Sequence, residues 1–572
     1  MKYSILVETY KKLESTPAKL AKVDILSELL QKTPSEQLPK VVLLIQGVVF
    51  PKFSGNELGI AIQMMIKAIA KAVGFSIEEI EKRFKKHGDL GVVAEECVKS
   101  KKQLTLSRKE LDVDMVFKNL QQLAYVTGSG SQDKKLNLIS ELLVSAKPEE
   151  AKYIVRTIIG DLRIGVAEGI IRDSIVKSFL LKDKNVDKNE ATKALDYAWN
   201  LLPDFGEIAV IARDKGIEGL KKIKVKLGNP IQVMLGEKAE SIKEVVDEFG
   251  RVAVEFKYDG MRAQISKKDD KIWIYTRRLE NVTKQFPDLV ELCLKALKPK
   301  ECIVEGEVVG LNPKTKVPVP FQILSQRIQR KYDIEKLIKE VPIQINLFDV
   351  IYVDGELLID KPLRERRKIL EKIVDVIPDK FVLAKQIVTD DVKLIEQFYK
   401  QALDAKQEGL FLKVLDSKYV FGRHVGGWYK IKPTMETLDL AIIGATWGTG
   451  KRAGWMGSFI LGCRDESSGK FLECGMLGTG VKEKKSGETD VTFKELTKLL
   501  KPYIISEKGT TIKIKPKIVI SVDYQEIQKS TNYESGFALR FPRFIALRED
   551  KGIEDVDTIE RIRYLYSLQK KR

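Results

Sequence analysis

The pattern of apolar residues changes twice along this chain of 572 residues, and these two changes most constrain how it can fold. Residues 1–221 place apolar side chains at helical spacing, as at Val23, Leu26 and Leu30, which predicts an all-helical region. The next part alternates short runs rich in β-branched and aromatic residues with helical segments, which is typical of a mixed α/β domain. After Pro433 the sequence consists of strand-like runs separated by glycine-rich turns.

We therefore expect three domains, at residues 1–221, 222–432 and 433–572. The first is expected to be all-helical, the second a mixed α/β domain, and the third a small β-barrel. About five strand-like runs over roughly 130 residues suit an OB-fold barrel. The overall fold class is then multidomain α + α/β + β.

The helical region contains two similar segments. The segment that starts at Ile25, ILSELLQKTPSEQLPKVVLLIQG, resembles LISELLVSAKPEEAKYIVRTIIG, which starts at Leu138. Their separation of about 110 residues exceeds the period of solenoid repeats. We interpret the region as two related helical halves packed as one domain. Chance similarity between amphipathic helices is the alternative.

Charge and composition limit the class of protein. Lys and Arg number 99 against 81 Asp and Glu, which gives a net charge of +18. This favours a polyanionic partner, such as nucleic acid or an anionic membrane surface, although a lysine-rich thermophilic surface gives the same balance. No apolar run approaches the ~20 residues of a bilayer span, and the N-terminus lacks the features of a secretory signal. We expect a soluble, cytoplasmic protein with no membrane partner.

Five cysteines and two histidines restrict the metal chemistry. The cysteines form no C-x-x-C pair and are odd in number, so neither a disulfide framework nor a zinc site is indicated. The histidines, His87 and His424, are too few for a histidine-rich metal centre. Any nucleophile must therefore be sought among other residue types.

The strongest local motif is K-x-D-G-x-R, from Lys257 to Arg262, which follows the strand-like run VAVEF. A lysine attacks phosphorus only as the neutral amine, and its ordinary pKa of about 10.4 leaves it protonated at neutral pH. Nearby cations lower such a pKa. We expect Arg262, Lys430, Lys432 and a bound divalent cation to act on Lys257 in this way. The alternative is a surface hairpin with both charged side chains in water.

Six further motifs follow along the chain: YTRR at 275–278, VEGE at 304–307, LFD at 347–349, EGLFLK at 408–413, WYKIK at 428–432 and RFPRF at 540–544. Together the motifs resemble the covalent nucleotidyltransferase superfamily, and specifically the ATP-dependent DNA ligases of the archaeal and eukaryotic type. They occur in the family's order, and the match covers essentially the whole chain. The resemblance implies that Lys257 becomes covalently adenylylated by ATP and that Phe348 stacks on adenine. Glu255, two residues before the lysine, is placed to accept hydrogen bonds from the adenine N6 amino group.

The resemblance also implies the phosphate contacts. Arg277, in the motif YTRR, would contact the nucleotide or the 5′ phosphate of DNA. Lys430 and Lys432 would meet the α-phosphate. Arg540 and Arg543, in the predicted barrel, would orient the pyrophosphate of ATP.

A divalent cation, Mg²⁺ or another, is implied as well. Glu307 is the expected ribose or metal contact, and Glu408 the expected metal ligand. Arg262 and Arg423 are further candidates for contacts with ATP, and Arg423 also for contacts with DNA phosphates. This set of groups suits nucleotidyl transfer, which depends on positioning and on neutralising phosphate charge.

The predicted function is therefore that of an ATP-dependent DNA ligase with helical DNA-binding, adenylation and OB-fold domains. It would seal 5′-phosphate/3′-hydroxyl nicks in duplex DNA through lysyl-AMP and DNA-adenylate, in replication, repair and recombination. We expect a monomer with nicked DNA as its partner. A sliding clamp is a further candidate partner, through residues 103–106.

The alternatives are an RNA ligase, a capping-type guanylyltransferase and a non-catalytic nucleic-acid-binding scaffold. The long helical region argues against the first two, and intact Lys257, Glu408 and Lys430 argue against the third. The segment GATWGTGK is not a P-loop, because its glycine spacing is wrong and Arg452 occupies the Ser/Thr position. The absence of clustered cysteines argues against a zinc-bearing NAD⁺-dependent ligase.

Overall fold

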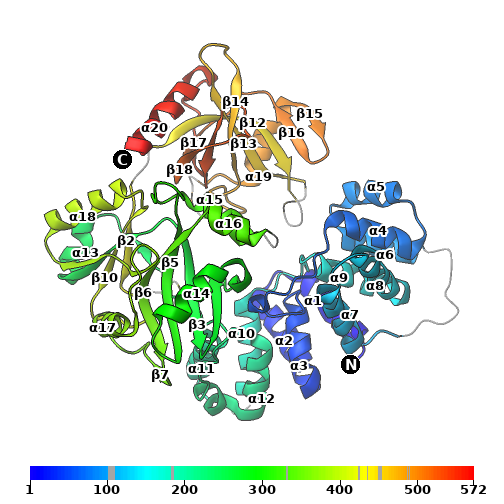
Figure 1. Ribbon diagram of the computed structural model, residues 1–572. Helices are drawn as coiled ribbons and strands as arrows, with labels where there is room; N and C mark the ends of the chain where they lie inside the picture. Colours follow the sequence, from blue (N-terminus) through cyan, green and yellow to red (C-terminus); the bar gives the residue numbers. More distant parts are fainter. Residues whose placement is uncertain are drawn as a thin grey trace. The chain divides into compact units, whose positions relative to one another are not determined.

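The computed structural model (Figure 1) describes the chain except residues 101–109, 182–185, 330–332, 423–425, 434–435, 449–451, 453, 486, 488–489 and 572. It divides into two compact units, Met1–Ile80 with Leu90–Lys432, and Glu81–Asp89 with Pro433–Arg572. The boundary after Lys432 lies where the sequence pattern changes for the second time. The expected boundary at 221/222 lies inside the first unit and stays a prediction. In the described part of the chain, no helix combines the length and apolar character that crossing a bilayer requires.

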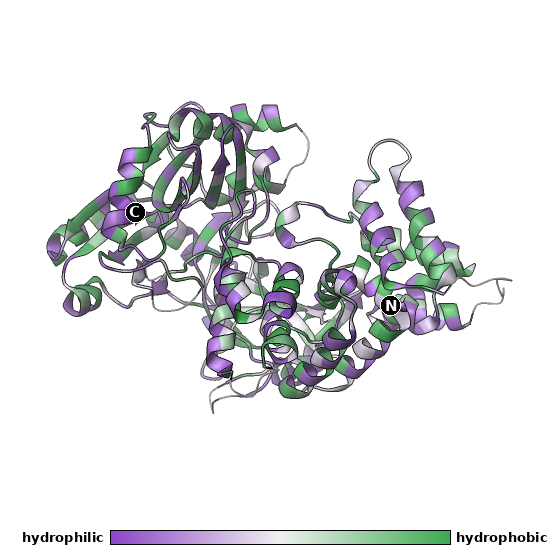
Figure 2. Ribbon diagram, turned by 90° about the horizontal axis from the view of Figure 1, so that it is seen from below, coloured by the Kyte–Doolittle hydropathy of each residue, from purple (hydrophilic) through white to green (hydrophobic). Residues whose placement is uncertain are grey.

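The N-terminal region is all-helical. Its helices are α1 Tyr3–Ser15, α2 Lys19–Lys32, α3 Leu38–Ile45, α4 Ile62–Val73, α5 Ile77–His87, α6 Leu90–Lys99, α7 Val113–Tyr125, α8 Ser131–Ser145, α9 Pro148–Ile158, α10 Glu168–Ile175, α11 Lys188–Leu201 and α12 Phe205–Lys221. Hydrophobic and hydrophilic stretches alternate along them (Figure 2), as amphipathic packing requires.

The packing of these helices is reciprocal. Helix α2 packs against α10, and α8 packs against α4. In the same way α3 packs against α12, and α9 against α6. Each run of six helices therefore buries the apolar faces of the other, which is the arrangement that two related halves would produce. The relationship between the halves itself stays an inference from the sequence.

Two sheets form the middle of the chain, and the first positions the candidate site. Its strand order is β1-β11-β10-β2-β9, and its strands are β1 Glu237–Lys238, β11 Trp428–Ile431, β10 Gly409–Val414, β2 Val252–Lys257 and β9 Gln386–Thr389. Side chains alternate between the two faces of a strand. Val252, Val254 and Phe256 face an apolar core shared with α13 (Ile242–Phe249) and α18 (Val392–Asp404). Glu255 and Lys257 therefore point to the opposite face.

The second sheet has the order β4-β3-β5-β6-β7, with β8 paired to β6. Its strands are β3 Met261–Lys268, β4 Lys271–Thr276, β5 Glu301–Gly310, β6 Ile343–Val353, β7 Glu356–Leu357 and β8 Phe381–Leu383. The helices of this part are α14 Pro287–Ala296, α15 Phe321–Gln329, α16 Ile334–Glu340 and α17 Leu363–Ile373. Strand register sets Arg262 opposite Glu307, and Gln264 opposite Glu305.

The second unit is β-rich. Its strands are β12 Leu438–Trp447, β13 Met456–Arg464, β14 Phe471–Leu477, β15 Ile504–Lys508, β16 Thr511–Ile514, β17 Val519–Asp523, β18 Glu526–Lys529, β19 Phe537–Arg540 and β20 Arg543–Leu547, with helices α19 Phe493–Leu500 and α20 Ile559–Lys571. The long strand β12 pairs with β13, β16 and β17 around one apolar core. The expected order of helical, mixed α/β and β-rich regions is confirmed.

Candidate active site

The polar face of the first sheet carries the candidate site. Register places Lys257 of β2 opposite Gly409 of β10, and Glu255 opposite Phe411. On the other side of β10, Phe411 lies opposite Lys430 of β11. Directly opposite residues of antiparallel strands share a face, so these side chains from three strands gather on one surface. The sequence named most of them, but their register comes from the structure.

A carboxylate links two of the predicted lysines. Lys257 Nζ lies 2.6 Å from Glu408 Oε2, and Lys432 Nζ lies 2.5 Å from the same oxygen. Burial disfavours the ionised form of Glu408, but the charges and hydrogen bonds of both lysines outweigh it and lower the pKa of this carboxyl. The setting of Lys257 thus differs from the expected, purely cationic one, because a carboxylate lies between the two ammonium groups.

Gly409, which follows Glu408, has a conformation that few other residues adopt. Its φ is 142°, and a Cβ built on it would lie 2.2 Å from the carbonyl oxygen of Ile431. Only glycine fits this close approach between β10 and β11. The close packing at Gly409 thereby fixes the backbone position of Glu408, the residue just before β10.

Glu307 is the second carboxylate of the site. Burial raises the pKa of Glu307 to about 7; the charges of Lys257 and Arg262 oppose the rise, and those of Glu408 and Asp259 add to it. No group of three His, Cys, Asp or Glu side chains that could hold a metal occurs within the described ranges. Two carboxylates are nevertheless a suitable set for Mg²⁺, which takes one or two protein carboxylates together with substrate phosphates.

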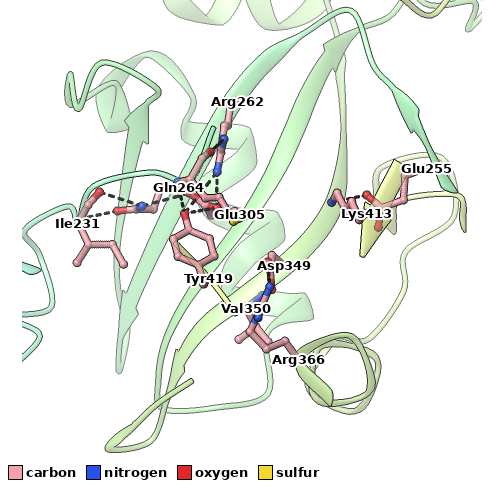
Figure 3. A network of polar contacts seen from close by, with 11 residues as sticks. Ile231, Glu255, Arg262, Gln264, Glu305, Asp349, Val350, Arg366, Lys413 and Tyr419 are labelled. Atoms are coloured by element: carbon pink, nitrogen blue, oxygen red, sulfur yellow. Dashed lines mark hydrogen bonds and ion pairs between the residues drawn. The ribbon is translucent and has the colours of Figure 1, made fainter. Parts of the chain in front are cut away.

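Arg262 belongs to a buried polar network (Figure 3). Its guanidinium donates to Glu305 Oε2 over 2.7 Å and to the carbonyl of Met234 over 2.5 Å. Tyr419 donates to the same oxygen of Glu305 over 2.8 Å, and Gln264 donates to the other over 3.3 Å. Burial opposes the charge of Arg262, but Glu305 outweighs it and raises the pKa of Arg262. The guanidinium of Arg262, predicted to act on Lys257, is thus compensated by its ion pair with Glu305.

Phe348, the predicted stacking ring, lies beside this network. It is 8% exposed and meets Trp428 edge to face, with ring centroids 5.8 Å apart. The Arg262 guanidinium lies 5.4 Å from the ring centroid. The next residue, Asp349, forms a fully buried ion pair with Arg366 over 2.8 Å (Figure 3). This pair fixes the strand that carries the ring.

Of the remaining predicted residues, Lys430 lies on this face, opposite Phe411, and the others lie elsewhere. Arg277 is exposed just after β4, and Lys430 donates to the carbonyl of Gly236 over 3.2 Å. In the second unit, Arg540 pairs with Glu526 over 3.0 Å, and Arg543 is exposed on β20. Arg423 lies outside the described residues, as does the proposed clamp-binding segment 103–106.

Sequence reasoning gave no role to several residues of this site. Phe411 has Lys257 Nζ 5.5 Å from its ring centroid. Lys413 and Gln386 both contact Glu255, and Glu305 and Tyr419 hold Arg262. Phe411 and Lys413 stand at alternate positions after Gly409, so the period of two was a usable signal for them. Gln386 carried no such signal, because its place depends on the pairing of β9 with β2.

Comparisons with known proteins agree along the whole chain. A family model described as ATP dependent DNA ligase domain matches residues 233–432, one described as DNA ligase N terminus matches residues 2–176, and one described as ATP dependent DNA ligase C terminal region matches residues 452–551. A DNA ligase of Nanoarchaeum equitans is 45% identical over 571 residues, which cover 100% of this chain and 99% of that protein.

A DNA ligase of Thermococcus onnurineus is 46% identical over 572 residues, with 100% of this chain and 99% of that protein covered. The solved structure named Pmar-Lig_PreS3 has a TM-score of 0.56 at 17% identity, over 95% of this chain and 99% of that one, which shows a shared fold. The matches to two relatives along their full length show common descent of the entire chain. The chain therefore belongs to the ATP-dependent DNA ligase family.

Proposed function

We propose that Lys257 is the nucleophile of this ATP-dependent DNA ligase. Its amine attacks the α-phosphate of ATP, so that a P–N bond forms and pyrophosphate leaves. The AMP group then passes to the 5′ phosphate of a nick, which frees the lysine. The 3′ hydroxyl attacks that phosphate, AMP leaves, and the strand is sealed. The observation that carries the proposal is the grouping of Lys257, Glu408 and Lys432 on one polar sheet face.

The charges on this face suit the first step. Lys430 and Lys432 offer positive charge to the α-phosphate, and such charge favours the transition state of nucleotidyl transfer. A divalent cation held by Glu307 and Glu408 would neutralise phosphate charge further. Glu408 forms ion pairs with both lysines. Lys257 must give up its proton before it attacks. The α-phosphate would attract Lys432 and repel Glu408, and movement of this carboxylate toward a divalent cation would release the amine from its ion pair.

The nucleotide contacts follow from the same face. Glu255 would accept hydrogen bonds from the adenine amino group, and Phe348 would stack on the base. Arg262, fixed by Glu305, and Glu307 would border the ribose and phosphates. Arg277, Arg423, Arg540 and Arg543 complete the proposed set of nucleotide or DNA phosphate contacts.

The domain roles are also part of the proposal. Residues 1–221 would bind DNA, residues 222–432 would carry adenylation, and residues 433–572 would form the OB-fold domain that brings Arg540 and Arg543 to ATP. The substrate is nicked duplex DNA, in keeping with a net charge of +18. We place the protein in the cytoplasm, with the chromosome, as a monomer, and propose a sliding clamp as its partner.

Transfer of label from ATP tests the proposal. The purified chain is incubated with ATP labelled at the α-phosphate and Mg²⁺, denatured and examined for bound label, and then chased with nicked DNA. The wild type should take up label and lose it to DNA, whereas Lys257→Ala should take up none. Lys418→Ala, which removes an exposed lysine paired with Asp360, is the matched control and should label normally. A Lys257→Ala protein that still takes up label would refute the assignment.

A further inference from the structure

Three neighbouring strands place one carboxylate between two hydrogen-bond donors. Gln386 of β9 lies directly opposite Glu255 of β2, and Phe411 of β10 lies opposite it on the other side. Lys413 stands two residues beyond Phe411 and so shares its face. Lys413 Nζ lies 2.6 Å from Glu255 Oε2 (Figure 3), and Gln386 Nε2 donates to Oε1 over 2.7 Å. Each carboxylate oxygen therefore has a donor of its own.

The two charged residues of this row of three, Glu255 and Lys413, are withdrawn from water, and Gln386 is half-buried. The side chains of Lys413 and Glu255 are only 2% and 3% exposed. Lys413 Nζ also lies 4.1 Å from the ring centroid of Trp428 and 4.6 Å from that of Phe348, the predicted adenine-stacking ring. Burial lowers the pKa of Lys413, although the charge of Glu255 opposes this. The pair thus lies against the aromatic groups of the proposed base pocket.

Whether Glu255 only accepts hydrogen bonds or can also donate them decides which base it can bind. An ionised carboxylate accepts hydrogen bonds and cannot donate them, whereas a protonated one also donates. Adenine carries an amino donor at position 6, and guanine and hypoxanthine carry an oxo acceptor there. A fixed, ionised Glu255 therefore pairs with the amino group and leaves an oxo group unsatisfied. Without its two donors the carboxylate would no longer be held in this orientation, and the distinction between the two bases would weaken.

We propose that Lys413 and Gln386 are positioning residues that fix Glu255 as a hydrogen-bond acceptor, and that this row gives the ligase its preference for a 6-aminopurine nucleotide over a 6-oxopurine one. The inference rests on the proposed function, in which Glu255 faces the base of ATP. Lys413 and Gln386 act through Glu255 and need not touch the nucleotide themselves.

The test compares self-adenylylation of the full chain by ATP with its inosinylation by inosine triphosphate, which has an oxo group at position 6. Single-turnover rates over a range of nucleotide concentrations give the specificity ratio of the two. We expect Gln386→Leu to bring the specificity ratio of ATP to inosine triphosphate about tenfold closer to one, the scale of one hydrogen bond to a charged group. Lys413→Met should narrow it roughly a hundredfold, because it removes both the donor and the charge. A purely structural role would lower both rates equally and leave the ratio unchanged.

Two further variants keep the result interpretable. Lys267→Met removes another buried lysine, one that donates to the Leu297 carbonyl and lies outside this row, and it should leave the ratio unchanged. The double variant Glu255→Gln with Lys413→Met removes both buried charges. If Lys413→Met alone does not fold, this double variant tests the role of Glu255 in the specificity ratio. Its ratio should approach one, since an amide can turn to donate or accept.

The outcomes separate the two proposals. A wild-type protein that forms no adduct on Lys257 with either nucleotide overturns the proposed function. A wild type that prefers ATP, together with Gln386→Leu and folded Lys413 variants whose ratios stay within about threefold of it, overturns this inference alone. Narrowed ratios in those variants, with an unchanged ratio in Lys267→Met, support it.

Discussion

Replacing Glu305 by Gln should loosen the sheet that carries Arg262. Glu305 is fully buried and binds Arg262, Gln264 and Tyr419. The amide keeps the shape of the side chain but leaves the largely buried guanidinium without its counter-charge. Removing one partner of a buried ion pair costs about 3–5 kcal/mol. Because the amide still accepts hydrogen bonds, we expect the lower end of that range.

Native-state hydrogen exchange measures this cost where it arises. A multidomain chain does not unfold in one step, whereas exchange of the β3 and β5 amides reports on the local opening of this sheet. A loss of about 3 kcal/mol corresponds to exchange roughly a hundredfold faster. Asp247→Asn, which breaks the exposed pair of Asp247 with Lys243, is the control and should change exchange little.

A double-mutant cycle isolates the pair itself. Arg262→Met combined with Glu305→Gln removes both charges and should recover most of the protection lost in Glu305→Gln, as replaced buried pairs commonly do. Protection of β3 and β5 in Glu305→Gln within about threefold of the wild type would refute the view that the Glu305 carboxylate compensates the charge of Arg262 and stabilises this sheet.

Three other predictions concern Gly409, Glu307 and the helical region. Gly409→Ala should lower the rate of self-adenylylation more than tenfold, on the order of the cost of a strained backbone, because its Cβ meets the Ile431 carbonyl. A rate equal to that of Gly169→Ala, a helical glycine with an ordinary φ and open space around its Cβ position, would contradict this. Because the pKa of Glu307 is raised to about 7 in the folded protein, the folded state binds more protons than the unfolded state. Stability should therefore fall as pH rises from the ordinary Glu value of about 4.3 to about 7, and Glu307→Gln should abolish that slope in pH-dependent hydrogen exchange of β5. Removing residues 1–221 should reduce nick sealing far more than self-adenylylation, and equal losses in the two assays would argue against a DNA-binding role for that region.

Much of the fold could be predicted, because the strands with regular patterns are also the buried ones. The run VAVEF became β2, whose residues from Val252 to Phe256 are all buried. Strand β15 was missed because its residues are largely exposed and polar. Strands β18 and β19 have four residues each, which is too short for a period to show.

The site could be predicted as a set of residues but not as a set of partners. Lys257, Glu408 and Lys432 were named from their motifs, and the structure brings them together. That one oxygen of Glu408 would serve both lysines could not be predicted, because it depends on side-chain positions across two strands. The ion pair between Glu255 and Lys413 has the same cause, since it depends on the register of β2 against β10.

Mapping the nucleotide adduct shows which residue is the nucleophile. The full chain is incubated with ATP and Mg²⁺, digested under alkaline conditions that preserve a phosphoramidate, and sequenced by tandem mass spectrometry. We expect one AMP group on the side chain of Lys257, lost when nicked DNA is added before digestion. An AMP group on any other residue, or a Lys257 peptide that stays unmodified while the protein seals nicks, would contradict it.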